Sequence, residues 1–190
     1  NGDGVDDIAV GATGVQVNGA NNAGAVYVFN GTLDLATISI FTQGSDGFST
    51  DPETGDKFGS SLTSGDFNND GFDDIIIGAY EADPNGDLSG ESYVVFGKAT
   101  GNYSASLELS SLLASNGGDG TNGFIINGID GGDYSGIAVS SAGDINNDGF
   151  DDIIIGALGA DPNGDISGES YVVFGKATGY SASLDLSALD

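Results

Sequence analysis

Two short segments of the chain carry carboxylates at a spacing that could bind a hard cation. GDFNNDGFDD occupies residues 65–74, and GDINNDGFDD returns at residues 143–152 with one substitution. Counted from Asp66, side-chain oxygens fall at positions 1, 3, 5 and 9, glycine stands at position 6, and position 7 offers only its backbone carbonyl. A short loop wraps calcium with such alternating oxygen donors and a glycine at the sharp turn. The pattern predicts two Ca²⁺ sites, one formed by Asp66, Asn68, Asp70, Phe72 and Asp74, and the other by Asp144, Asn146, Asp148, Phe150 and Asp152.

A third, partial copy of this motif opens the chain. NGDGVDDIAVGA matches NNDGFDDIIIGA and places Asn1, Asp3, Val5 and Asp7 at positions 3, 5, 7 and 9, without a position 1. An EF-hand would need glutamate at position 12, where Ile77 stands, so these are calcium loops inside β-hairpins. A solvated turn rich in Asp, Asn and Gly is the alternative interpretation. The presence of every ligand type in two copies favours metal.

The hairpins belong to a long internal repeat. Residues 65–101 and 143–179 differ at only four positions. Runs of β-branched and aromatic residues predict four strands in the complete copy. The acidic loop joins the first two strands, and Asn85-Gly86 predicts a turn between the second and third. One short helix that ends at Gly117 is expected before the fourth. The predicted strands span residues 58–65, 73–79, 92–97 and 123–128.

Composition excludes several classes of function. The chain has 29 acidic residues against three lysines, for a net charge of -26, so it lacks the basic surface that binds nucleic acid. No apolar run approaches the roughly 20 residues of a membrane span, and membrane insertion is not expected. Because the chain contains neither cysteine nor histidine, thiol nucleophiles, zinc-thiolate sites and Ser-His-Asp triads are excluded.

The segment FGSSLTSGDFNNDGFDDIIIGA resembles the FG-GAP repeat of integrin α-subunit β-propellers and their bacterial relatives. The pairs Phe58-Gly59 and Gly78-Ala79, with the acidic hairpin between them, carry the resemblance. It implies an all-β fold of consecutive four-stranded antiparallel blades of a calcium-binding β-propeller, here an incomplete, open set. The spacing of 78 residues between copies is long for such a blade. The expected divisions are strands two to four of a partial blade in residues 1–57, a complete blade in 58–133, and strands one to three of another in 134–190.

Two further interpretations of the sequence remain open, one for the fold and one for additional metal sites. GGDGTNGF, residues 117–124, faintly matches the nonapeptide of a calcium-binding parallel β-helix, but it occurs once. The loops DPNGDLSGE and DPNGDISGE, residues 83–91 and 161–169, also alternate oxygen side chains. They have Leu88 and Ile166 where the first loops have glycine, so a plain polar hairpin is favoured over a further metal site.

Three hypotheses for function follow. The favoured one is a calcium-stabilised extracellular or cell-surface module for binding or adhesion, whose protein or glycan ligand meets the face opposite the calcium loops. The second is a structural subunit of a surface layer or filament, which would self-associate. The third is an accessory propeller of a secreted enzyme whose catalytic domain lies elsewhere. Catalysis by the pair Asp73-Asp74 is not expected, since adjacent strand residues point to opposite faces and Asp74 is assigned to metal.

Overall fold

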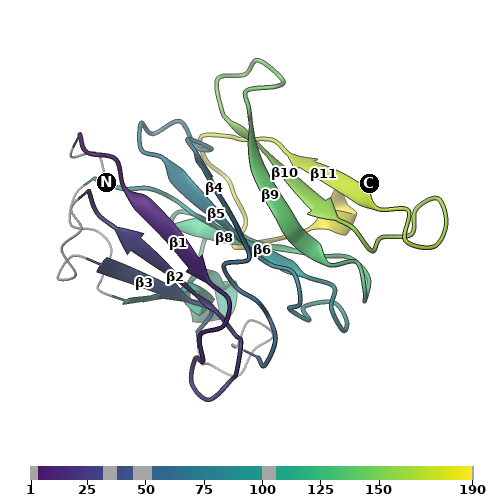
Figure 1. Cartoon of the computed structure of the whole chain (residues 1–190). Coiled ribbons are helices and arrows are strands. Elements are labelled where there is room, and N and C mark those ends of the chain that lie inside the picture. The colour runs from purple at the N-terminus through teal and green to yellow at the C-terminus, as the bar shows by residue number, and fades with distance from the viewer. Residues whose placement is uncertain (1–3, 32–37, 45–52, 100–105, 190) are drawn as a thin grey trace.

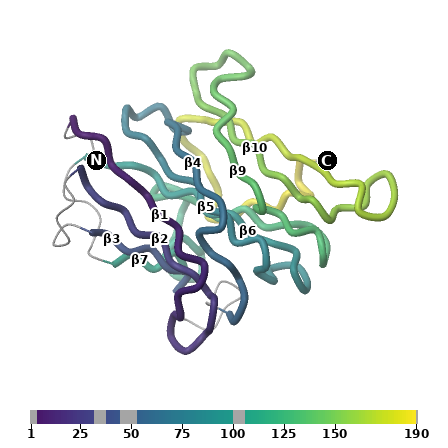
Figure 2. Tube along the Cα trace, viewed as in Figure 1, coloured from purple at the N-terminus to yellow at the C-terminus, as the bar shows by residue number. Residues whose placement is uncertain are grey.

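The chain folds into three β-sheets that lie side by side, as expected for consecutive propeller blades (Figure 1). This computed structural model describes residues 4–31, 38–44, 53–99 and 106–189. We call the sheets the first, middle and third blade in chain order, and Figure 2 traces the chain through them. The all-β fold class, with an incomplete set of blades, is confirmed.

Each blade is built mainly from neighbouring antiparallel strands. The first contains β1 (Ile8–Ala12), β2 (Ala25–Phe29) and β3 (Ile38–Thr42). The middle blade contains β4 (Ser61–Gly65), β5 (Asp74–Ala79), β6 (Glu91–Val95) and β8 (Gly123–Asn127). The third contains β9 (Ser135–Gly143), β10 (Asp152–Ala157) and β11 (Glu169–Val173). All four strands expected in the complete repeat are present, with bounds shifted by a few residues.

An additional outer strand crosses between blades. β7 (Ser106–Glu108) follows the middle blade's β6 in sequence but pairs in parallel with β3 of the first blade. β12 (Ser183–Asp185) likewise leaves the third blade and pairs in parallel with β8 of the middle one. We call these two strands the return strands. They account for part of the unusual repeat length, because each repeat carries a segment that completes the preceding sheet.

Short 3-10 helices follow the return strands. The segment expected to form one helix instead forms β7, η2 (Leu109–Leu112) and η3 (Ala114–Asn116), and ends at Gly117 in the left-handed conformation, as expected. After β12 comes η4 (Leu186–Ala188). Leu109 and Leu186, at equivalent positions, are fully buried and anchor these turns. None of the helices in the described part of the chain is long and apolar enough to cross a membrane.

The hydrophobic core lies between blades. Ile77 and Tyr93 of the middle blade pack with Phe58 and Phe41 toward the first blade, whereas Ile76 faces the third blade. Alternate residues of β5 therefore contribute to two separate interfaces, and this strand is buried on both faces. The interface between the middle and third blades also contains Ile153 and Ile155 of β10, together with Phe67, Phe96, Phe124 and Tyr180.

Candidate metal centres

The first acidic hairpin, between β4 and β5, is closed by carboxylate and amide oxygens that accept backbone hydrogen bonds. The Asp66 carboxylate accepts the N–H groups of Asp70 and Gly71, each at 3.0 Å. Asn68 Oδ1 accepts the N–H of Asp70 at 2.9 Å, and Asp70 Oδ1 accepts that of Phe72 at 3.0 Å. Gly71 has a φ of 88°, which favours glycine at position 6. The side chains at positions 1, 3 and 5 are thus bound to one compact loop.

The second hairpin, between β9 and β10, repeats this arrangement. Asp144 accepts the N–H groups of Asp148 and Gly149, each at 2.9 Å. Asn146 Oδ1 accepts the N–H of Asp148 at 3.0 Å, and Asp148 Oδ1 accepts that of Phe150 at 3.1 Å. Both hairpins project toward the top of the view in Figure 1. The two copies therefore share one geometry as well as one sequence.

Position 9 of each hairpin is placed differently from positions 1, 3 and 5. Asp74 is buried at the start of β5, and its carboxylate accepts the N–H groups of Phe67 at 2.9 Å and Gly97 at 2.8 Å. Asp152 is fully buried and makes the two equivalent bonds. Burial raises the pKa of Asp74 to about 7, the two N–H donors oppose the rise, and the nearby carboxylates of Asp70 and Asp66 add to it. A cation would relieve this accumulation of like charge.

Residues of the third blade form hydrogen bonds with the acidic hairpin of the middle blade. Asp151 Oδ2 accepts the N–H of Asp66 at 3.3 Å, and the Asp151 N–H donates to the Asp66 carbonyl at 3.3 Å. The Phe67 carbonyl accepts the Lys176 N–H at 3.1 Å and the Tyr180 hydroxyl at 3.0 Å. The sequence pattern did not mark Asp151 as a functional residue. Its place beside a hairpin of another blade carries no local sequence signal.

The oxygen atoms of the acidic hairpins fit a hard cation, provided that amide and backbone carbonyl oxygens bind it together with carboxylates. Among the described residues, no three Asp, Glu, His or Cys side chains converge tightly enough to bind a metal by themselves. A cation in hairpin 66–74 would depend on the Asn68 amide and the Phe72 carbonyl as well as on carboxylates. Of the partial motif, Asn1 and Asp3 lie outside the described residues, Val5 is exposed and Asp7 is half-buried.

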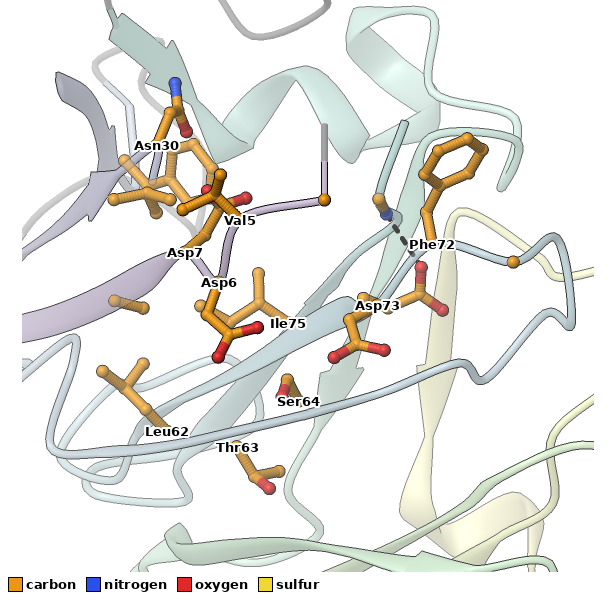
Figure 3. Close-up of a pocket in the computed structure, with 17 residues that line it drawn as sticks. Val5, Asp6, Asp7, Asn30, Leu62, Thr63, Ser64, Phe72, Asp73 and Ile75 are labelled. Atoms are coloured by element: carbon orange, nitrogen blue, oxygen red, sulfur yellow. Dashed lines mark hydrogen bonds between the residues drawn. The ribbon is translucent and has the colours of Figure 1, made fainter. Parts of the chain in front are cut away.

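A cavity of about 750 Å³ lies between the first and middle blades, beside the acidic hairpin. The carboxylates of two Asp-Asp pairs, Asp6-Asp7 and Asp73-Asp74, line its wall. Hydroxyl groups from β4 and apolar side chains complete the lining. In Figure 3, Asp6 and Asp73 approach the space from opposite blades. This cavity could not be predicted from the sequence, because it depends on how two repeats pack. The polar residues that line it are Asp6, Asp7, Asn30, Thr63, Ser64, Asp73 and Asp74.

The loops 83–91 and 161–169 resemble the acidic hairpins more closely than their sequence predicts. Asp83 Oδ1 accepts the N–H of Leu88 at 2.6 Å, and Asp161 Oδ1 accepts that of Ile166 at 2.5 Å. Leu88 and Ile166 take the left-handed φ values of 62° and 52°. The conformation at position 6 is therefore the same as in the acidic hairpins, although glycine is absent, and it costs backbone strain.

The glutamate that ends the first of these loops turns into the blade interface. Glu91 is fully buried and accepts the Tyr93 hydroxyl, which in turn accepts a hydrogen bond from Gln43 at 3.3 Å. Burial raises the pKa of Glu91 to about 8, against the effect of the Tyr93 bond, and the charge of Asp56 raises it further. Burial also raises the pKa of Asp56 to about 6. Glu169 accepts the Tyr171 hydroxyl at 2.7 Å in the same way.

Comparison with known proteins agrees with the observed geometry. The sequence matches the FG-GAP repeat family in three places, at residues 1–29, 58–95 and 135–173. It is 34% identical over 106 residues to integrin alpha-3 of Mus musculus, and to the same extent to integrin alpha-3 of Cricetulus griseus. Each match covers 55% of this chain but only 8% or 9% of the relative. The matched part of the chain thus spans less than a tenth of the length of these two relatives.

Proposed function

The chain belongs to the FG-GAP repeat family, and on this premise we propose that it is a calcium-stabilised, non-catalytic segment of an extracellular β-propeller that acts in binding or adhesion. The likeness to integrin alpha-3 supports an adhesion-type role. The three divisions 1–57, 58–133 and 134–190 are proposed as its successive repeats with their linkers, and the return strand of each of the last two pairs with the preceding blade.

The observation that carries the metal part of this proposal is the identical closure of hairpins 66–74 and 144–152. In both, backbone N–H groups fix the carboxylates at positions 1 and 5, and they leave further lone pairs on these oxygens for a cation. Bound calcium would supply positive charge among carboxylates that otherwise repel one another. Its ligands would be Asp66, Asn68, Asp70, Phe72 and Asp74 in one hairpin and Asp144, Asn146, Asp148, Phe150 and Asp152 in the other.

The proposed ligand-binding face lies at the opposite ends of the strands. Loop 83–91 joins β5 to β6, and loop 161–169 joins β10 to β11, so both lie away from the acidic hairpins. We place a protein or glycan ligand there. An extracellular setting fits a structural calcium site, because extracellular modules bind calcium at about 10⁻⁴ to 10⁻³ M.

Calorimetric titration of the 190-residue chain with calcium tests the proposal. We expect two equivalent sites, and we expect Asp70→Ala and Asp148→Ala each to remove one of them. Asp87→Ala, an exposed carboxylate of loop 83–91, is the matched control and should leave both sites. Binding to immobilised matrix proteins and to a glycan array, with calcium and with chelator, tests the adhesion role. A chain that takes up no calcium contradicts the metal part, and a calcium-loaded chain that binds no surface contradicts the adhesion part.

One observation favours the structural-subunit alternative. The third blade exposes the large apolar side chains of Ile154, Leu158 and Phe174, and exposed apolar surface can drive association. Sedimentation of the purified chain with calcium and with chelator distinguishes the two roles. Calcium-dependent oligomers would favour the subunit, and a monomer that binds a matrix protein or glycan would favour the adhesion module.

A further inference from the structure

The composition of the chain limits which side chains an oxidant can attack. The sequence contains no cysteine, methionine, tryptophan or histidine, but it has seven tyrosines. Thiol and thioether groups are the usual targets of oxidants in proteins, and this chain has neither. An accessible tyrosine is therefore the side chain with which a one-electron oxidant would react here.

Two tyrosines lie side by side where the middle and third blades meet. Tyr80 directly follows β5 of the middle blade, and Tyr134 directly precedes β9 of the third. Their ring centroids are 6.2 Å apart, and the ring planes are tilted by 48°. Both residues are half-buried, so part of each side chain reaches solvent. The sequence repeat places Thr13 and Lys57 at the equivalent positions between the first and middle blades, so the aromatic pair belongs to one junction alone.

Contacts with both blades hold the Tyr134 ring in this place. Tyr134 has a left-handed φ of 55°, which costs backbone strain in a bulky residue and persists only where the surroundings impose it. Its N–H donates to the Leu88 carbonyl of the middle blade at 3.0 Å. A Cβ built on Gly159 would lie 3.0 Å from Tyr134 Cδ2, so the ring packs against the Gly159 backbone. These contacts keep the Tyr134 ring beside Tyr80.

The other tyrosines that the structure describes are less suited to coupling. Tyr93 and Tyr171 are buried, and each donates its hydroxyl to a glutamate. Tyr180 is packed among phenylalanine rings and donates its hydroxyl to the Phe67 carbonyl at 3.0 Å. Tyr27 is half-buried but lies in β2 of the first blade. Tyr80 and Tyr134 combine access to solvent with contact between two phenol rings.

We propose that Tyr80 and Tyr134 form an oxidative cross-linking site, at which a peroxidase with hydrogen peroxide joins the middle and third blades through a dityrosine bond. Each phenol loses one electron and one proton. The two phenoxyl radicals couple through one C–C bond between ring carbons ortho to the hydroxyls, and the hydrogens of those carbons return to the phenolic oxygens through solvent. The two electrons and two protons reduce one hydrogen peroxide to two waters. Exposure of the chain to such an oxidant rests on the proposed extracellular setting, whereas the coupling itself does not.

The Glu81 carboxylate is placed to accept the phenolic proton of Tyr80. Burial raises the pKa of Tyr80, and the hydrogen bond of its hydroxyl with Glu81 raises it further. Tyr80 is therefore a neutral phenol at neutral pH, and its oxidation must release a proton. Rotation of the two aromatic side chains, whose ring torsions are broad, would bring the ortho carbons together.

The test treats a dilute solution of the 190-residue chain with a haem peroxidase and hydrogen peroxide. We expect dityrosine fluorescence from a chain that remains monomeric in denaturing electrophoresis. Mass spectrometry of the digested chain should find the Tyr80 and Tyr134 peptides linked, with the loss of two hydrogen atoms. Tyr80→Phe and Tyr134→Phe should each lose nearly all of the fluorescence. Tyr27→Phe, which removes a half-buried phenol from the first blade, is the matched control and should keep it.

The cross-linked chain should also melt about 10 °C higher than the untreated chain, because the bond closes a long loop in the unfolded state. Free tyrosine in a parallel reaction shows that the oxidant is active, and melting curves before oxidation show that the variants are folded. A parent chain without dityrosine while free tyrosine couples overturns the proposal. So does a link between other tyrosines, including Tyr103, which lies outside the described residues. The readout needs neither calcium nor a ligand, so its failure is distinct from failure of the proposed function.

Discussion

Asp151 Oδ2 accepts the backbone N–H of Asp66 at 3.3 Å, across the interface between the third and middle blades. Asp66 is the proposed first ligand of one metal site, and Asp151 precedes the last proposed ligand of the other. The two hairpins are therefore joined by a carboxylate that neither uses for metal. Cation binding and blade packing should be coupled through this contact.

Replacing Asp151 tests this coupling. Asp151→Ala removes the acceptor of the Asp66 N–H, and we expect a loss of about 1 kcal/mol of unfolding free energy, typical of one hydrogen bond. Chemical denaturation with saturating calcium measures the loss. Asp73→Ala, which removes the matching exposed carboxylate of the middle blade, is the control. Equal effects of the two substitutions would contradict a specific role for Asp151.

Calcium should raise the melting temperature by mass action on the folded state. At a hundredfold excess over the dissociation constant, each site would add about 2.7 kcal/mol of stability. For a chain of this size, 1 kcal/mol corresponds to about 2 to 4 °C. Scanning calorimetry with calcium and with chelator measures the shift. Asp70→Ala and Asp148→Ala should each lose about half of it, and identical curves in calcium and chelator would refute calcium stabilisation.

Glu91 should make stability fall as the solution becomes more alkaline. Its pKa is raised from 4.5 to about 8 by burial, so between these values the folded chain holds a proton that the unfolded chain has released. Unfolding free energy should therefore decrease from about pH 4.5 to pH 8, by up to about 1.4 kcal/mol per pH unit. Asp56, with its pKa raised to about 6, acts in the same direction over a narrower range.

Denaturation of Glu91→Gln across this pH range isolates the contribution of that carboxyl. The variant keeps the side-chain shape without the charge, so its pH dependence should be shallower than that of the parent. Glu108→Gln, at an exposed position, should leave the slope unchanged. A parent and Glu91→Gln variant with the same slope would show that Glu91 is not protonated in the folded chain at neutral pH.

Two glycines at equivalent repeat positions should differ in how much stability they lose on substitution by alanine. At Gly78, a methyl group would lie 2.1 Å from the Gly136 carbonyl oxygen, so the third blade must shift. We expect Gly78→Ala to lose roughly 1 to 3 kcal/mol, as for overpacked sites. Gly156→Ala should lose less than about 1 kcal/mol, because its methyl group would meet only Ala138, at 3.7 to 3.8 Å. Urea denaturation of both variants measures the difference, and similar losses would refute the comparison.

Salt should stabilise the chain even when calcium is saturating. Two calcium ions would neutralise only four of the 26 excess negative charges, and the remainder repel one another at low ionic strength. Sodium chloride and potassium chloride should raise the melting temperature equally if screening is the cause. Stability that is flat or falls up to about seawater ionic strength would instead favour a cationic partner.

Local sequence patterns predicted the strands and the acidic hairpins well, because both depend on neighbouring residues. The β-branched runs predicted β5 and β8, and the spacing of Asp66, Asn68 and Asp70 predicted a closed loop. The conformation of loop 83–91 was harder to predict, since Leu88 adopts a left-handed conformation that its side chain disfavours. The last residue of this loop, Glu91, lies in the blade interface, where its carboxylate accepts a hydrogen bond from the Tyr93 hydroxyl.

Features that join different repeats could not be predicted from either repeat alone. The return strand β7 pairs with β3 across more than 60 residues, and its short sequence SLE has no strong strand signal. The contact between Asp151 and Asp66, the cavity beside Asp73 and the close approach of Gly78 to Gly136 likewise exist only after blades pack.

The return strands also impose an order on synthesis. β8 of the middle blade gains its outer partner only when residues 183–185 have left the ribosome, more than 50 residues after β8 itself. During that interval, which lasts about 3 to about 12 seconds at about 5 to 20 residues per second, the nascent chain presents an open sheet edge. A ribosome that paused between residues 127 and 183 would prolong this exposure, so such a pause should increase aggregation of the nascent chain more than a pause after residue 185.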